Sequence, residues 1–171
     1  MSIKKISITG PESTGKSTLA AHLAEALDTV WVPEYAREYL NRLDRPYEES
    51  DLLEIAKGQI NAEDTLTKQA NAYLICDTDL IVIKIWSEHK YGRCHPWILE
   101  QIEQRQYALT VLTYIDIPWE EDPMREHPDL RTYFYDLYKK TLTSMGIHYI
   151  EAKGDLQQRM ALALKAIADL K

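Results

Sequence analysis

The sequence predicts an α/β domain built on a parallel five-stranded sheet flanked by helices in three layers. Short apolar runs alternate with amphipathic segments, a glycine-rich turn joins the first run to the first helix, and 171 residues suffice for one sizeable core. The predicted strands are Ile3–Thr9, Thr29–Val32, Ala72–Cys76, Ala108–Ile115 and His148–Glu151. The predicted helices are Lys16–Leu27, Glu34–Leu43, Ser50–Asn71, Asp79–Tyr91, Pro96–Arg105, Asp129–Met145 and Asp155–Leu170.

Residue spacing supports these elements in order. The first strand alternates isoleucines with Ser7 and Thr9, which is the two-residue period of a strand. Leucines then recur at helical spacing in the first helix, and the middle of the chain repeats the alternation of strands and helices. The last helix starts after Gly154 and Asp155 and carries the clearest apolar face. We see no linker or repeat, so residues 1–171 are predicted to form a single domain.

The turn after the first strand, Gly10-Pro-Glu-Ser-Thr-Gly-Lys-Ser17, matches the phosphate-binding pattern G-x-x-x-x-G-K-[ST]. Its glycines let consecutive N–H groups point at phosphate oxygens, and the following helix adds the positive end of its dipole. Lys16 can reach the β- and γ-phosphates, and the Ser17 hydroxyl can bind Mg²⁺. The pattern predicts a P-loop NTPase fold that binds a nucleoside triphosphate. The predicted nucleotide-binding residues here are Gly10, Glu12, Ser13, Thr14, Gly15, Lys16, Ser17 and Thr18.

An apolar run that ends in Asp77 follows the pattern of the second phosphate element of this fold, whose carboxylate holds Mg²⁺ directly or through water. Asp79 comes two residues later, at the start of a helix. It has two interpretations, as part of the substrate site or as an ordinary helix cap.

Glu34 and Arg37 follow the second strand, at the edge of the sheet where the acceptor of a small-molecule kinase would bind. A carboxylate there can accept a proton from an acceptor hydroxyl or hold a sugar diol. Arg37 can reach the transferred phosphoryl group. The alternative is a local Glu–Arg pair at i, i+3 on an exposed helix start.

Residues 117–131 are predicted to form a lid, because three prolines and many charges between Asp116 and Arg131 exclude a strand or long helix. Arg125 and Arg131 can then stabilise charge on the transferred group. The alternative is a solvated loop whose arginines pair with Glu126 or Asp129.

Trp86 and Tyr91 can form an aromatic wall for a flat or cationic ring, although Trp86 alternatively belongs to the core. By analogy, adenine would pack near the loop after the last strand, at 152–154.

Composition limits the function classes. The net charge of −7 argues against a protein that grips a nucleic-acid backbone. No apolar run approaches the roughly 18–20 residues of a membrane helix, and the first strand starts at once, so we expect neither membrane span nor signal peptide. Cys76 and Cys94 lack zinc-ligand spacing and are too few for a disulfide framework. We therefore expect a cytoplasmic protein.

The motifs together resemble the ribosylnicotinamide kinase domain of NadR-type bacterial NAD-salvage proteins. The resemblance covers nearly the whole chain and rests on the phosphate loop and on more particular motifs, which are Pro33-Glu-Tyr-Ala-Arg-Glu38, Asp77-Thr-Asp79, Tyr91-Gly92 with His95-Pro96, and Asp122 with Arg125. It implies a nucleoside-kinase-like fold with a lid, the use of ATP and Mg²⁺, and phosphorylation of the ribose 5′-hydroxyl of nicotinamide riboside. The longer members carry DNA-binding and adenylyltransferase domains in front of the kinase, and the resemblance implies neither role for these 171 residues.

Two sets of roles are therefore expected. The expected catalytic residues are Lys16, Glu34, Asp77, Arg37 and Arg125. Either Glu34 or Asp77 would act as the base, and Arg131 would bind the nucleotide. Ser17 and Asp77 would hold Mg²⁺, and the residues expected to bind the riboside are Glu34, Tyr35, Asp79, Trp86 and Tyr91. The alternatives are a kinase of another nucleoside or small hydroxyl metabolite, or a nucleotide-dependent regulatory ATPase. Oligomeric state is not predictable from the sequence.

Overall fold

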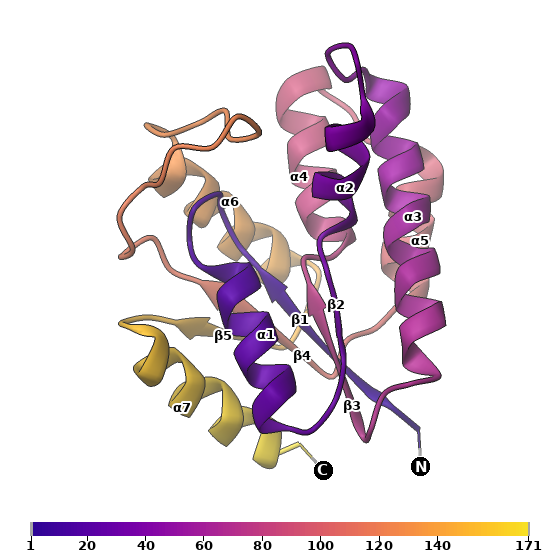
Figure 1. The fold of residues 1–171 in the computed structure, drawn as a ribbon. Helices are drawn as coiled ribbons and strands as arrows, with labels where there is room; N and C mark the ends of the chain where they lie inside the picture. The colour runs from indigo at the N-terminus through magenta and orange to yellow at the C-terminus, as the bar shows by residue number, and fades with distance from the viewer. Residues whose placement is uncertain (1, 171) are drawn as a thin grey trace.

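The computed structural model describes residues 2–170 and has the predicted order of strands and helices (Figure 1). The strands are β1 (Lys4–Thr9), β2 (Trp31–Val32), β3 (Tyr73–Asp77), β4 (Leu109–Thr113) and β5 (Tyr149–Ala152). The helices are α1 (Lys16–Ala26), α2 (Tyr35–Arg42), α3 (Glu49–Thr67), α4 (Leu80–Tyr91), α5 (Pro96–Gln104), α6 (Arg131–Ser144) and α7 (Leu156–Ala168).

The sequence-based element bounds are wrong mainly at helix ends. Helix α3 stops at Thr67 rather than at Asn71, because the chain turns back into β3 through Ala72, whose φ is 58°. Glu34, Asp79 and Asp155 precede their helices as N-cap residues and are not part of the first turn.

The sheet is parallel throughout, with strand order β2-β3-β1-β4-β5. The central strand β1 pairs with β3 on one side and with β4 on the other, so that Ile6 lies between Ile75 and Leu109. The connections therefore run to one side of β1 and then to the other. In such sheets the carboxyl ends of the strands meet at one edge, and ligands bind where the direction of winding reverses.

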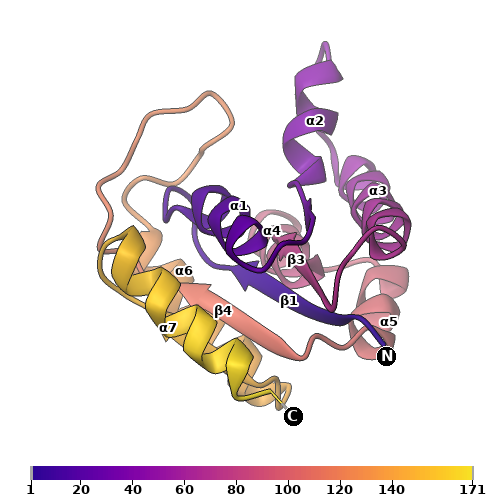
Figure 2. The same ribbon diagram turned by 60° about the horizontal axis from the view of Figure 1, so that its bottom comes forward.

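Helices cover both faces of the sheet, which places the core in two layers (Figures 1 and 2). Helices α1 and α7 pack on one face against Ile6 and Ile8, which are fully buried. Helices α4 and α6 pack on the other face against Leu112, and α2, α3, α4 and α5 form a further apolar cluster around Ile55 and Ile83. The two-residue period of β1 turns Ser7 and Thr9 away from the α1 side. None of the helices within residues 2–170 is long and apolar enough to cross a membrane.

Candidate active site

A cavity of about 310 Å³ opens at the carboxyl edge of the sheet. Its walls come from the phosphate loop and the start of α1 (10–18), from the start of α2, from one side of α4, from the lid segment (117–131) and from the first turns of α6 and α7. The predicted site residues that line it are Gly10, Glu12, Ser13, Thr14, Gly15, Lys16, Ser17, Thr18, Glu34, Arg37, Trp86 and Arg125. The structure therefore brings most of the predicted residues together around one space.

The phosphate loop has a backbone that requires small residues at defined places. Gly10, Ser13 and Gly15 have φ values of 144°, 56° and 77°. A Cβ at Gly10 would lie 2.5 Å from Thr113 Oγ1, so the loop can approach the end of β4 only with glycine there. The Thr113 hydroxyl is 2.7 Å from Thr14 Oγ1 and donates to the carbonyl at the end of β1 at 3.2 Å. The neighbouring strand therefore fixes the shape of the loop.

Lys16 projects from the start of α1 among acidic groups. Its ammonium donates to the Pro11 carbonyl at 2.7 Å. Burial lowers the pKa of Lys16 by disfavouring the charged form, and the carboxylates of Glu34, Asp77 and Glu12 oppose that effect. The lysine is thus held at the centre of the phosphate loop, where its charge can meet phosphate oxygens.

Ser17 and Asp77 form a direct pair, because the Ser17 hydroxyl donates to Asp77 Oδ2 at 2.5 Å. Asp77 is 2% exposed, and its buried Oδ1 has no hydrogen-bond partner among residues 2–170. Burial raises the pKa of Asp77 to about 6, the bond from Ser17 opposes the rise, and the charge of Glu34 adds to it. A hydroxyl beside a carboxylate with an unpartnered oxygen is the kind of donor set that Mg²⁺ takes in phosphoryl-transfer sites.

The start of α2 forms one wall of the cavity. Glu34, the residue before this helix, and Arg37, one turn later, both line the cavity. The guanidinium of Arg37 pairs with Asp122 of the lid segment at 2.8 Å. Within residues 2–170 no ion pair joins Arg37 to Glu34, so the local pair considered from the sequence is not formed. Glu34 thus lines the cavity without a direct ion pair to its neighbour on the helix.

The lid segment is irregular, as predicted, and contacts the phosphate loop directly. The carboxylate of Glu12 accepts the backbone N–H groups of Glu126 at 3.2 Å and His127 at 3.1 Å. The hydroxyl of Ser13 accepts the N–H of Glu120 at 2.9 Å. These side chains of the phosphate loop hold the lid segment over the cavity.

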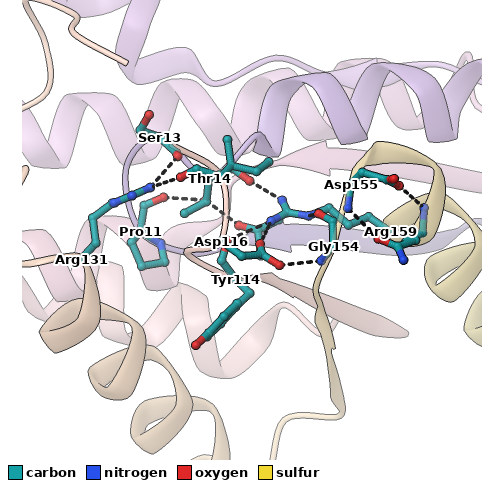
Figure 3. A network of polar contacts seen from close by, with 12 residues as sticks. Pro11, Ser13, Thr14, Tyr114, Asp116, Arg131, Gly154, Asp155 and Arg159 are labelled. Atoms are coloured by element: carbon teal, nitrogen blue, oxygen red, sulfur yellow. Dashed lines mark hydrogen bonds and ion pairs between the residues drawn. The ribbon is translucent and has the colours of Figure 1, made fainter. Parts of the chain in front are cut away.

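The two arginines of the lid segment have different surroundings. Arg125 lines the cavity and donates to the carbonyl of Glu120. Arg131 donates to the carbonyls of Ser13 at 3.0 Å and Ile117 at 2.7 Å (Figure 3). Within the described chain neither forms an ion pair with the carboxylates of the lid segment. Arg131, expected to contact the nucleotide, instead binds backbone carbonyls because its helix starts directly beside the phosphate loop.

Asp79 lies away from the cavity walls. It is 1% exposed and accepts the Ser7 hydroxyl at 2.5 Å and the N–H groups of Ile81 and Val82 at 3.0 and 3.3 Å. It is the N-cap of α4, and burial raises its pKa to about 6. Its carboxylate oxygens are used for these bonds, so the placement agrees with the capping interpretation and not with substrate binding.

Of the three predicted aromatic residues, one lines the cavity and two do not. Trp86 lines the cavity and also packs against Tyr47, with ring centroids 5.0 Å apart, so the wall and the core interpretations both describe it. Tyr91 packs in the apolar cluster of α2 to α5 and does not line the cavity. Tyr35 lies against Gly58 of α3, because the first turn of α2 directs it away from the side that carries Glu34.

Comparison with known proteins places the chain in a family. A family described as an AAA domain matches residues 5–159. The chain belongs to this AAA-domain family. The trifunctional NAD biosynthesis/regulator protein NadR of Salmonella typhimurium and that of Escherichia coli are each 29% identical to it over 157 residues, or 88% of the chain. The chain spans 38% of the length of these two relatives.

Solved structures confirm the fold of this AAA-domain chain. Crystal structures of NadR protein, one with NAD and AMP-PNP and one with NR, superpose with a TM-score of 0.77 at 22% identity. Each superposition covers 99% of this chain. It covers 49% of the NadR chain with NAD and AMP-PNP and 52% of the NadR chain with NR. Thymidylate kinase from Ehrlichia chaffeensis superposes with a TM-score of 0.69 at 16% identity, over 98% of the chain and 100% of its own length. The predicted P-loop fold and the resemblance to NadR-type proteins are both confirmed.

Sequence reasoning missed two polar residues of this AAA-domain site, Thr113 and Arg159. Thr113 ends β4 at the carboxyl edge, a position that by itself signals a functional side chain. Arg159 lines the cavity and is 1% exposed, although it is charged. Its signal is the spacing in α7, where it falls on the apolar face between Leu156 and Ala163.

Proposed function

We propose that this chain is an ATP-dependent kinase that phosphorylates the ribose 5′-hydroxyl of nicotinamide riboside to give nicotinamide mononucleotide, in cytoplasmic NAD salvage. The observation that carries the proposal is a single cavity with the phosphate loop on one wall and Glu34 and Trp86 on another, closed by a segment that bears Arg125. The similarity to NadR proteins, one of which was crystallised with NR, supports the choice of acceptor. In this proposal the 171 residues act as one kinase domain with residues 117–131 as its lid.

On the donor side, the N–H groups of the phosphate loop and Lys16 hold the triphosphate of ATP. Ser17 and Asp77 fit Mg²⁺, since a hydroxyl and a carboxylate with an unpartnered oxygen lie side by side. Bound there, the metal would neutralise charge on the β- and γ-phosphates. Arg125 stabilises the negative charge that develops on the transferred group, because it faces the same cavity from the lid.

On the acceptor side, Glu34 is the stronger candidate for the base. Both carboxylates were open from the sequence, but Asp77 does not line the cavity and is bonded to Ser17, whereas Glu34 lines it. Glu34 takes the proton of the 5′-hydroxyl as that oxygen bonds to the γ-phosphorus, and the bond to the β,γ-bridging oxygen breaks to release ADP. Arg37 lies one turn away, within the same cavity, and offsets the charge of the transferred group.

The ring of the riboside is a pyridinium cation, which suits the acidic and aromatic acceptor side. The face of Trp86 can attract this cation, and Glu34 adds a negative charge. Tyr35, Asp79 and Tyr91 are not part of this proposal, because they do not line the cavity.

The proposal is tested by ADP release from Mg²⁺-ATP with and without nicotinamide riboside, with the product identified by mass. We expect strong stimulation and the appearance of nicotinamide mononucleotide. Absence of stimulation by a folded protein that binds ATP would refute the acceptor, and a screen of other nucleosides would follow.

Variants then test the roles. Lys16→Ala should abolish turnover, and Glu34→Gln should lower kcat by about 10²–10⁴-fold, the usual contribution of a general base. Glu38→Gln is a matched control one turn along α2, since Glu38 pairs with Arg42 on the surface. If Glu34→Gln and Asp77→Asn both leave turnover near that of the control, the assignment of the acceptor side is wrong.

A further inference from the structure

Arg159 of α7 carries a charge that is almost completely buried behind the phosphate loop. Its guanidinium donates to the carbonyl of Thr14, to the carbonyl of Tyr114 at 2.9 Å and to Asp116 Oδ1 at 2.6 Å, while Nε donates to the carbonyl of Gly154 at 2.9 Å (Figure 3). One side chain thus joins the phosphate loop, the chain after β4 and the loop after β5. Four of the five N–H groups of this buried arginine have acceptors, and such a side chain fixes geometry because each of these N–H groups has a defined direction.

The bond to Thr14 sets the direction of a peptide plane. In a trans peptide the carbonyl of one residue and the N–H of the next point in opposite directions, and no cis peptide occurs among residues 2–170. Arg159 holds the carbonyl of Thr14 on the α7 side, so the N–H of Gly15 points the other way. Arg131 holds the carbonyl of Ser13 at 3.0 Å, which orients the N–H of Thr14 in the same manner. N–H groups so oriented are what a phosphate loop offers to its anion.

Asp116 extends the same network to the loop that follows β5. Its Oδ2 accepts the N–H of Gly154 at 2.6 Å, while its Oδ1 accepts Arg159. Burial alone would raise the pKa of Asp116, but the hydrogen bonds from Gly154 and Arg159 outweigh it and the pKa is lowered. Asp116 is therefore ionised at neutral pH, and its bonds to Arg159 and Gly154 join the phosphate loop to the loop at 152–154.

We propose that Arg159 is a positioning residue for the nucleoside triphosphate: it orients the Thr14–Gly15 peptide toward the phosphates and, through Asp116, sets the loop at 152–154 beside the nucleoside. This role rests on the proposed use of ATP but not on the identity of the acceptor. Arg159 need not touch the nucleotide, since it acts through backbone groups.

The test measures binding of Mg²⁺-ATP and of inorganic tripolyphosphate by titration calorimetry, without any acceptor. Arg159→Lys keeps the charge but cannot reach four acceptors, and Arg159→Met removes the charge at similar volume. Both variants should bind ATP and tripolyphosphate at least about tenfold more weakly, which is about 1.4 kcal/mol. Asp116→Asn should weaken ATP more than tripolyphosphate, because it acts on the nucleoside side.

Arg105→Met is the matched control. Arg105 is also partly buried and pairs with Asp64 at 2.8 Å, but it follows α5 and does not line the cavity. The Arg105→Met variant should bind ATP as tightly as the wild type does, even if its melting temperature is lower.

The outcomes separate the two proposals. If the wild type binds ATP and folded Arg159→Lys binds it equally well, the positioning role is refuted. The same holds if the variants lose only thermal stability, as the control does. Should Arg159→Met not fold, Arg159→Lys and Asp116→Asn decide the question. ATP binding without stimulation by nicotinamide riboside would refute only the acceptor assignment, and a folded wild type that does not bind ATP would refute both proposals.

Discussion

The contact between Tyr35 and Gly58 gives a prediction that links helix packing to the acceptor side. A Cβ at Gly58 of α3 would lie 1.9, 2.3 and 2.4 Å from three atoms of the Tyr35 ring. These distances are far inside van der Waals contact, so in Gly58→Ala the ring must move. Because Tyr35 is the first residue of α2, its movement should displace the helix start that carries Glu34 and Arg37.

Two opposing effects set the magnitude. Overpacking a well-filled contact costs about 1–3 kcal/mol. Replacing glycine by alanine inside a helix stabilises by about 1 kcal/mol, and Gly58 is interior to α3. The net loss in wild type is therefore about 0–2 kcal/mol. In a Tyr35→Ala background the clash is gone, and the same Gly58→Ala change should stabilise by about 1 kcal/mol.

The coupling energy between Gly58→Ala and Tyr35→Ala is measured directly by equilibrium unfolding in urea. The four proteins compared are the wild type, the two single variants and the double variant. The expected coupling is about 1–3 kcal/mol, the size of the overpacking penalty. Equal stabilisation by Gly58→Ala in both backgrounds would refute the reasoning. In the kinase assay, Gly58→Ala should raise KM for the acceptor while leaving the affinity for ATP unchanged.

Three further predictions follow from polar contacts. Hydrogen bonds from Arg45 hold the pKa of Asp51 well below its usual range, so the stabilising contribution of Asp51 is full above about pH 4 and is lost as the pH falls further. When the free energy of unfolding in urea is measured from pH 7 to pH 2, it should depend less on pH in Asp51→Asn than in the wild type. Parallel pH profiles for the two proteins would contradict this. Thr113→Val should cost about 1–3 kcal/mol in thermal unfolding and weaken ATP binding, whereas Thr113→Ser should preserve both. Glu12→Ala should speed hydrogen exchange of the two lid amides that it accepts, and unchanged exchange would show that other contacts hold the lid.

The sequence predicted the fold because its signals are local. The phosphate-loop pattern lies between a strand and a helix of clear period, and each strand and helix follows from similar short-range spacing. The position of Asp79 was ambiguous because an acid two residues beyond a strand serves equally as a cap or as a ligand. Only the packing of α4 against β1, which brings the Ser7 hydroxyl to 2.5 Å, decides between them.

The contacts that close the site were beyond prediction because they join distant residues. Arg37 and Asp122 are 85 residues apart, and no local pattern indicates that they pair. Helical phase could have placed Tyr35, since Tyr35 and Tyr39 share the face of α2 opposite to Arg37. The spacing in α7 likewise places Arg159 on the apolar face of that helix. The roles of Lys16, Glu34 and the other catalytic residues stay predictions until variants are measured.

The central position of β1 has a consequence for how the protein is made. This strand is synthesised before both of its neighbours, β3 and β4, which end at Asp77 and Thr113. Until both have been synthesised, the apolar side chains of β1 lack their native cover, and pairing requires closure of long loops. Slow translation before residue 113 would prolong exposure of this aggregation-prone segment, so the nascent chain is expected to depend on chaperones during that interval.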